Sequence, residues 1–157
     1  MGITSGINKD GTIFGINDAC TRGQIVTFLW RAAGSQEPHT DQNVFTDVKE
    51  TSPFYKAILW ATEMGITSGM TDTLFGIDMS CTRGQAVTFI YRYAHTPEYT
   101  NGAVFKDVPE KMFCYKAVSW AVEQDITKGT DKAGTLFSPN AFCTRGQIVT
   151  FLYRYQN

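Results

Sequence analysis

Long apolar runs, histidines and a surplus of charge of either sign are all scarce in this sequence. No stretch approaches the length of a membrane-spanning helix. The formal net charge of the 157 residues is -1, so a broad surface for nucleic acid is not expected, and an anionic ligand would need a few well-placed cations. The two histidines, His39 and His95, lie in linker stretches without a repeated acid–base partner. We therefore expect no membrane span, no nucleic-acid binding and no catalysis.

We expect no targeting segment in this sequence either. Met1 leads straight into Gly2-Ile3-Thr4-Ser5-Gly6, a motif that returns at Gly65–Gly69, and we expect the chain to start inside a longer parent protein. What is present is typical of a folded chain, with 43% hydrophobic, 13% aromatic and 18% charged residues. The length suits one compact domain.

A twelve-residue motif that occurs three times is the strongest signal in the sequence. C-T-R-G-Q-I-V-T-F-L-W-R fills Cys20–Arg31, and close copies fill Cys81–Arg92 and Cys143–Arg154. Nine of the twelve positions are identical in all copies, and the spacings are 61 and 62 residues. A second block, F-x-D-V followed by Y-K-A-x-x-W-A, precedes only the last two copies. The chain thus holds two complete repeats and the C-terminal half of another.

Each complete repeat is predicted to form a helix, a loop and a second helix. Ser52-Pro53 has the form of an N-cap followed by proline at the first helical position, and Gly65 suits the left-handed residue after that helix. The second helix opens at a threonine with a glutamine three residues on, the capping-box pattern. The fold class is then all-α, with tandem repeats packed into one domain. The half repeat covers 1–34, and the complete repeats cover 35–97 and 98–157.

The order of these pieces resembles the S-layer homology repeat of bacterial cell-surface proteins. That family reads F-x-D-V, an aromatic-rich first helix, G-I-x-x-G, a loop with a buried phenylalanine, and T-R-A-E at the second helix. The matching residues here are Asp47, Trp60, Gly65, Gly69, Phe75 and Thr82-Arg83-Gly84-Gln85, then Asp107, Trp120, Ile126, Gly129, Phe137 and Thr144-Arg145-Gly146-Gln147. The resemblance covers the whole chain, with Gly-Gln in place of Ala-Glu in every copy.

This resemblance implies a pseudo-threefold domain whose grooves bind an anionic secondary cell-wall polysaccharide, often through a pyruvylated sugar. It also implies a non-catalytic anchoring module at the bacterial cell surface, outside the cell, with no cofactor and no metal. The alternative function is a protein–protein assembly module that does not bind sugar. A wall hydrolase is disfavoured, because the sequence offers no acid/base pair or nucleophile.

Arginine occupies the first position of all three second helices (Arg22, Arg83, Arg145). The helix macrodipole makes a cation there unfavourable by roughly 0.3–1 kcal/mol, so helix stability does not explain the choice. Unpaired helix N–H groups beside a guanidinium would form a site for a carboxylate or phosphate. The glycines that follow, Gly84 and Gly146 among them, would let a ligand approach the backbone. The competing interpretation is that each arginine pairs with an aspartate or a neighbouring repeat's carbonyls and locks the repeats together.

Other candidate ligand residues have equally plain structural alternatives. Asp47 and Asp107 either bind sugar hydroxyls or stabilise a turn. Trp60 and Trp120 either stack on a sugar ring or fill the core. The family motif adds Gly69 and Gly129 to the candidates.

Cysteine occupies three equivalent positions (Cys20, Cys81, Cys143), and Cys114 stands alone. A metal site made from the three equivalent thiols is conceivable, but no C-x-x-C or Cys/His spacing supports it. Buried free thiols without a disulfide are the favoured interpretation.

The half repeat at 1–34 lacks a first helix, and Ile25, Phe28 and Leu29 form an apolar face that expects one. Exposure would forfeit roughly 1.5–3 kcal/mol for each large side chain. We therefore expect this face to pack against a neighbouring copy in a twofold homodimer, unless the other repeats close over it in a monomer. The groove around Arg22 is expected to be the weakest, because its own repeat supplies neither the aspartate nor the tryptophan.

Overall fold

The computed structural model describes residues 2–157, and within that range it contains five α-helices and no strand. Strand-like pairing in the described residues consists of isolated bridges, three of them between different loops and one, Thr71 with Leu74, within a loop. The all-α prediction is therefore confirmed. The helices are α1 (Arg22–Ala32), α2 (Tyr55–Glu63), α3 (Arg83–Tyr93), α4 (Tyr115–Glu123) and α5 (Arg145–Gln156).

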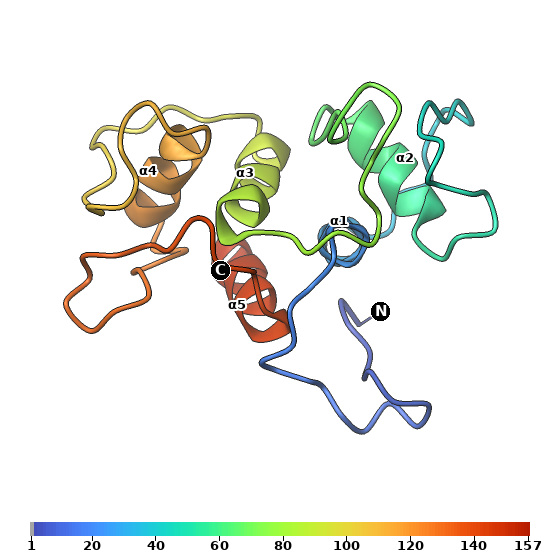
Figure 1. Cartoon of the computed structure of the whole chain (residues 1–157), viewed down its shortest axis with the longest axis horizontal. Helices are drawn as coiled ribbons and strands as arrows, with labels where there is room; N and C mark the ends of the chain where they lie inside the picture. Colours follow the sequence, from blue (N-terminus) through green and yellow to red (C-terminus); the bar gives the residue numbers. More distant parts are fainter. Residues whose placement is uncertain (1) are drawn as a thin grey trace.

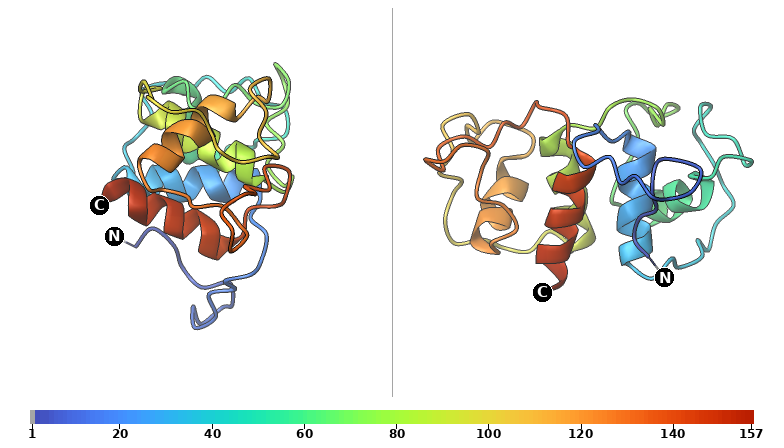
Figure 2. Two further views of the ribbon diagram at one scale, coloured as in Figure 1. Left: turned by 90° about the vertical axis from the view of Figure 1, so that its left-hand side faces the viewer. Right: turned by 90° about the horizontal axis from the view of Figure 1, so that it is seen from below.

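Three of the helices, α1, α3 and α5, form the centre of the molecule and contact one another in pairs (Figure 1). The shorter α2 packs on the outside of α1, and α4 packs on the outside of α3. In the right-hand view of Figure 2, α1 and α5 stand side by side with roughly parallel axes. Each short helix thus packs on the long helix that precedes it in the chain. In the described part of the chain, no short helix packs on α5.

The three equivalent cysteines join the repeats at the pseudo-threefold axis. The backbone N–H of Cys20 donates to the carbonyl of Cys143, that of Cys81 to Cys20, and that of Cys143 to Cys81, at 2.9, 2.9 and 2.8 Å. These bonds close a ring in which each repeat both donates and accepts once. Because the ring needs all three copies of the loop, the half repeat is an equal member of the central bundle.

The long helices begin where the capping box predicts. The side chain of Thr21 accepts from the N–H of Gln24, and the side chain of Gln24 accepts from the N–H of Thr21; α3 and α5 repeat both bonds. Two orphan donors are satisfied at each start, which fixes the register of the arginine that follows the cap.

The short helices begin later than the sequence pattern suggested. The first residue of α2 is Tyr55, and its N-cap residue, Phe54, makes no side-chain hydrogen bond to the helix. In the preceding turn, the hydroxyl of Ser52 accepts a hydrogen bond from the N–H of Phe54. Ser52 therefore stabilises the turn and does not cap the helix. The helix exits agree with prediction, since Gly65 and its counterpart Asp125 have φ of 68° and 56°.

The predicted exposed face of the half repeat is buried. Ile25, Phe28 and Leu29 are 0%, 4% and 1% exposed. The first helix of the following repeat, α2, covers α1, and α5 covers it from the other side. The prediction that this face forms a homodimer is therefore wrong. The short helix of each complete repeat packs on the long helix of the preceding repeat, so α1 is covered and α5 is the long helix without a short helix on it.

Candidate ligand grooves

Three equivalent grooves lie between the central helices. Each is bounded by the arginine that starts one long helix, by a short loop segment and by the next long helix; the segment ends in Ser-Gly in the first and third grooves and reads Thr127-Lys128-Gly129 in the second. We name them after that arginine: the Arg22, Arg83 and Arg145 grooves, with volumes of about 190, 500 and 240 Å³. The next long helix contributes a glutamine, a threonine, a phenylalanine and an arginine to each, namely Gln85, Thr88, Phe89 and Arg92; Gln147, Thr150, Phe151 and Arg154; and Gln24, Thr27, Phe28 and Arg31.

The guanidinium of Arg22 lies in an aromatic slot. Its carbon Cζ is 5.0 Å from the ring centre of Phe75 and 5.3 Å from that of Phe89, and its Nε donates to the carbonyl of Phe75 at 2.9 Å. Arg83 repeats this arrangement with Phe137 and Phe151. The expected bond to a neighbouring repeat's carbonyl is therefore present, so these arginines do lock repeats together.

The buried arginines have no carboxylate partner within ion-pair distance in residues 2–157. Arg22 and Arg83 are only 3% and 2% exposed, and burial lowers the pKa of both. The Nη2 atoms of these two side chains are buried and have no hydrogen-bond acceptor within the described residues. A buried charged donor without a partner is costly, so each is a place where an anionic acceptor would be stabilised.

The third arginine differs. Nη2 of Arg145 donates to the hydroxyl of Thr4 at 3.0 Å and to the carbonyl of Ser5 at 2.6 Å, while its Nε donates to Phe14. Thr4 and Ser5 thus supply the acceptors for Nη2 of Arg145 that the Nη2 atoms of Arg22 and Arg83 lack.

The helix N–H groups are not available to a ligand. Those of Arg22 and Gly23 donate to the carbonyls of Met79 and Ile77, and the N–H of Gln24 donates to its cap. The starts of α3 and α5 are occupied in the same way. The predicted contribution of free helix N–H groups is therefore wrong, and at the helix start itself only the guanidinium can donate to a ligand.

The aspartates cap the loop that carries the buried phenylalanine. The carboxylate of Asp47 accepts from the N–H groups of Phe75, Gly76 and Ile77 at 2.8, 2.7 and 3.0 Å. Asp107 accepts from Phe137 and Ser138, and the third position there is Pro139, which has no N–H. The arrangement supports the turn alternative over sugar binding for both aspartates.

The tryptophans belong to the core. Trp60 is 2% exposed and lies 5.7 Å from the ring of Tyr93. Trp120 is 4% exposed and lies between the rings of Tyr91 and Tyr155 at 5.5 and 5.9 Å. Neither ring is open to a sugar, so the core alternative holds for Trp60 and Trp120 and the stacking alternative is wrong.

The candidate glycines serve different purposes. A side-chain carbon at Gly84 would lie 3.1 Å from the ring of Phe113, so this position allows α4 to approach α3 and gives no access to a ligand. A side-chain carbon at Gly146 would lie 2.6 Å from the side chain of Ile16, so this position allows the first loop to approach α5, and it also lines the Arg83 groove. Gly69 and Gly129 have φ of 87° and 90°, which favours glycine, and both line grooves.

Sequence reasoning missed the second arginine of each groove. Arg92 and Arg154 end the twelve-residue motif nine positions after its first arginine, and their Nη1 atoms donate to the carbonyls of Ile66 and Ile126. Their identity in all copies was the available signal. Each groove therefore carries two arginines and no acidic lining residue, which makes it locally cationic in a chain of net charge -1.

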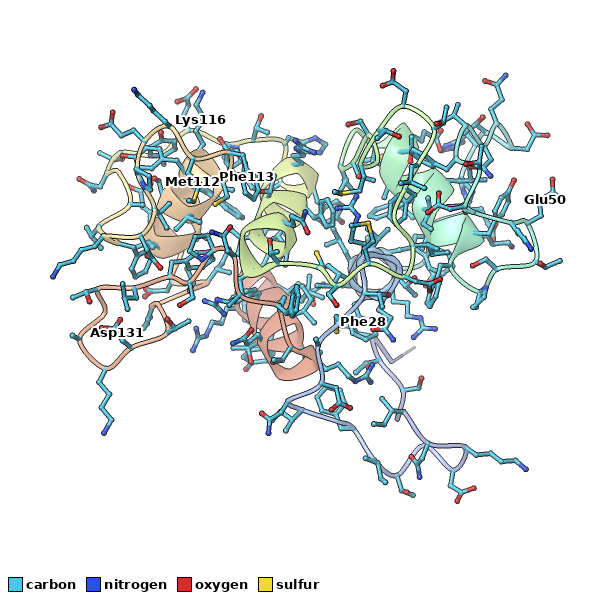
Figure 3. The ribbon with its side chains drawn as sticks, in the orientation of Figure 1. Phe28, Glu50, Met112, Phe113, Lys116 and Asp131 are labelled. Carbon is cyan, nitrogen blue, oxygen red and sulfur yellow. The ribbon has the colours of Figure 1, made fainter. Side chains whose placement is uncertain are left out.

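An exposed phenylalanine at the edge of the Arg22 groove was also missed. Phe113 precedes α4, is 63% exposed, and lies on the side of that helix facing α3 (Figure 3). Phe54 has the same place in the Arg145 groove. The Arg83 groove has no such aromatic wall and has the largest volume of the three, so it, and not the Arg22 groove, is the incomplete one.

The four cysteines are buried free thiols. Burial raises the pKa of Cys20 to about 11 and that of Cys81 to about 12, so neither is a thiolate near neutral pH. Among residues 2–157 no cluster of three metal-ligating side chains occurs, and no helix there has the length and apolar character needed to cross a membrane.

Comparison with known proteins places this chain in a family. The family model of the S-layer homology domain matches residues 44–87 and 104–149. The chain is 30% identical over 115 residues to a cell surface protein of Thermoanaerobacter kivui, a match that covers 70% of this chain and 15% of that protein. It is 29% identical over 123 residues to an endoglucanase of Bacillus sp. (strain KSM-635), covering 78% of this chain and 13% of that protein.

The chain belongs to the S-layer homology domain family. Domains of this family are non-catalytic modules that anchor proteins to the cell wall. The chain spans less than a sixth of the length of either relative, so any enzymatic activity named for those proteins concerns far more sequence than is present here.

Proposed function

We propose that this chain anchors its parent protein outside the cell by binding an anionic secondary cell-wall polysaccharide in the Arg22 and Arg83 grooves. The observation that carries the proposal is the buried, unpartnered Nη2 atom of each arginine in a groove without acidic residues. A sugar carboxylate, as in a pyruvylated residue, supplies the charged acceptor that these atoms lack.

The Arg22 groove also offers contacts for the sugar itself. In the Arg22 groove, Ser68, Gln85 and Thr88 provide polar groups, Arg92 adds a second cation, and the ring of Phe113 provides an exposed apolar face. Polar groups beside an aromatic face suit a pyranose, which has hydroxyl edges and apolar C–H faces. Phe113 thus takes the stacking role that the buried tryptophans cannot have.

The Arg145 groove is expected to contribute least. Its guanidinium already donates to Thr4 and Ser5, so an incoming carboxylate would have to displace protein acceptors. The polysaccharide is therefore bound at two principal sites, and two weak sites on one chain strengthen attachment to a repetitive polymer.

Co-sedimentation with purified cell walls tests the proposal. Arg92→Ala with Arg154→Ala removes one exposed arginine from each principal groove and leaves the buried arginines in place. If each loss costs roughly 1.5–3 kcal/mol, as for hydrogen bonds to charged groups, wall binding falls at least tenfold. Lys49→Ala with Lys111→Ala, at exposed positions outside the grooves, is the matched control.

Walls stripped of their non-peptidoglycan polymer provide the second arm of the experiment. The proposal predicts that the wild-type chain does not sediment with stripped walls. Equal binding to intact and stripped walls, or full binding by the double arginine variant, would contradict it. Absence of binding to any wall would favour the alternative, a protein–protein assembly module.

A further inference from the structure

The loop segment that bounds each groove carries different side chains before and after its glycine. The three segments read Ser5-Gly6-Ile7 in the Arg145 groove, Ser68-Gly69-Met70 in the Arg22 groove and Lys128-Gly129-Thr130 in the Arg83 groove. Two grooves thus share a serine and an apolar residue, whereas the Arg83 groove has a cation and a hydroxyl. Lys128 and Thr130 belong to the last complete repeat, so this difference is independent of the half repeat at 1–34.

The backbones of the Arg22 and Arg83 segments have the same local form. Gly69 and Gly129 have φ of 87° and 90°. Their N–H groups donate to the hydroxyls of Thr67 and Thr127 at 3.2 and 3.3 Å. The side chains at positions 68 and 128 therefore leave the backbone at equivalent places, and the difference between the two grooves lies in the side chains themselves.

Lys128 is the third cation of the Arg83 groove. Nη1 of Arg154 donates to the carbonyl of Ile126 at 3.2 Å, which holds the second arginine against the backbone two residues before Lys128. The buried Nη2 of Arg83 has no acceptor in the described residues. Among the described residues that line this groove, none is acidic. The groove therefore has three cations where the Arg22 groove, with its own pair of arginines, has two.

Thr130 keeps the rim of the Arg83 groove polar. Its hydroxyl lies 2.8 Å from the hydroxyl of Ser138 and 3.2 Å from the carbonyl of Leu136. Its counterpart in the Arg22 groove, Met70, presents a thioether side chain that is 43% exposed. A doubly charged anion is strongly hydrated, and desolvation beside an apolar side chain costs more than beside a hydroxyl. The rim of the Arg83 groove is thus the better surroundings for such an anion.

The competing interpretation is that Lys128 serves only as the partner of Asp125. Its Nζ lies 3.4 Å from the Asp125 carboxylate, and the two side chains are 72% and 82% exposed. An ion pair at such an exposed place contributes little, because solvent screens both charges. Lys128 lines the groove and Asp125 does not, so the ammonium can turn to a ligand in the groove at little cost.

We infer that the Arg83 groove is selective for a phosphate monoester on a sugar of the wall polymer, whereas the Arg22 groove lacks this preference over a carboxylate. At neutral pH a phosphate monoester has a charge of roughly −1.5 to −2 and three acceptor oxygens, and a carboxylate has one charge and two oxygens. The third cation therefore stabilises the phosphate more than the carboxylate. The inference rests on the proposed function, because it specifies which anion one of the two principal grooves prefers.

Titration of the chain with three soluble anions, followed through the arginine Nε NMR signals, tests this preference. The probes are N-acetylglucosamine 1-phosphate, glucuronic acid, which carries a carboxylate, and inorganic phosphate. The signals of Arg83 and Arg22 report on the two grooves separately. At Arg83 the affinity for the sugar phosphate relative to glucuronate should be about fivefold higher than at Arg22, the effect of one further pair of charges in contact at high dielectric. Inorganic phosphate should bind more weakly than the sugar phosphate, because it lacks the sugar.

Exchange of the two loop residues provides the matched variants. Lys128→Ser gives the Arg83 groove the residue of the Arg22 groove and should lower the selectivity at Arg83 to that at Arg22. Ser68→Lys should raise the selectivity at Arg22 by about fivefold. Lys132→Ser removes the same charge from an exposed position of the same loop outside the groove, and it should leave both selectivities unchanged. All three positions are exposed, so the melting temperature should stay the same.

The outcomes separate this inference from the proposed function. Equal selectivity at Arg83 and Arg22, or unchanged selectivity in Lys128→Ser, would overturn the phosphate preference. Tighter binding of inorganic phosphate than of the sugar phosphate would overturn the assignment to a wall sugar. If glucuronate still shifts both arginine signals in these cases, the grooves bind anions as proposed and only the preference is wrong. If none of the three anions shifts either signal, the proposed function fails together with the inference.

Discussion

The carbonyl of Phe75 accepts a hydrogen bond from Nε of Arg22 at 2.9 Å, and the ring of the same phenylalanine covers the guanidinium. Arg22 starts the long helix of one repeat, and Phe75 lies in the loop of the next. The two expected roles of the arginine are therefore not exclusive: Nε and the ring contact hold the repeats together, while Nη2 stays without an acceptor.

Replacing a buried arginine will reduce stability as well as binding. Arg83→Ala removes the bond to the carbonyl of Phe137 and two ring contacts, and we expect the free energy of unfolding to fall by about 1.5–3 kcal/mol. Chemical denaturation followed by circular dichroism measures this. Unchanged stability would contradict the part of this arginine in holding the repeats together.

Asp47 makes the fold sensitive to acid. Burial alone would raise the pKa of its carboxyl, but the N–H groups of Ile77, Phe75 and Gly76 hold that pKa below its usual value. The carboxylate's contribution is therefore complete above the unfolded pKa of about 3.9 and is lost as the pH falls through the lower folded value.

Asp47→Asn should thus lower stability at neutral pH by about 1–3 kcal/mol, because an amide cannot accept from all three donors. It should also flatten the dependence of the melting temperature on pH below about 4. Asp72→Asn, at an exposed position, is the control. A variant with the wild-type acid profile would contradict the assigned role.

The two aromatic residues of α4 and its preceding turn should behave in opposite ways. Trp120→Ala opens a cavity between two tyrosine rings and should cost about 3–5 kcal/mol of stability. Phe113→Ala should change stability little, because the ring is mostly exposed, and should weaken wall binding by about 0.5–1.5 kcal/mol. Melting curves and co-sedimentation of both variants test the pair. Wild-type wall binding by Phe113→Ala would remove this residue from the site.

The thiols should be inert in the folded protein. Burial raises the pKa of Cys20 and Cys114 to about 11 and that of Cys81 to about 12, so a thiol reagent at pH 8 meets almost no thiolate. All four cysteines should react only after denaturation. Rapid reaction of one or more in the native state would show that the cysteine ring at the axis opens.

The sequence predicts the local structure of this chain better than it predicts which helix packs on which. The capping boxes and the left-handed exits depend on a few neighbouring residues, and both were predicted. The packing of α2 on α1 is a relation between repeats, which no pattern within a repeat can express, so the uncovered face was assigned to the wrong helix.

The same limit explains the errors at the site. Trp60 and Trp120 are equally compatible with a core and with a sugar platform until their ring neighbours are known. The helix N–H groups were expected to be free because their acceptors, such as the carbonyls of Ile77 and Met79, come from another repeat. Arg92 and Arg154 occupy identical positions of the repeated motif, but nothing in the neighbouring sequence marked them as groove residues.

The most direct test of the central claim is the arginine side-chain NMR spectrum of the chain during titration with soluble wall polysaccharide freed of peptidoglycan. Arginine-to-lysine variants assign the Nε signals. If an anionic sugar meets the unpartnered Nη2 atoms, the signals of Arg22 and Arg83 shift with added polysaccharide, while that of Arg145, whose Nη2 already donates to Ser5, stays in place. Saturable wall binding with no change at Arg22 or Arg83, or a shift confined to Arg145, would contradict the account.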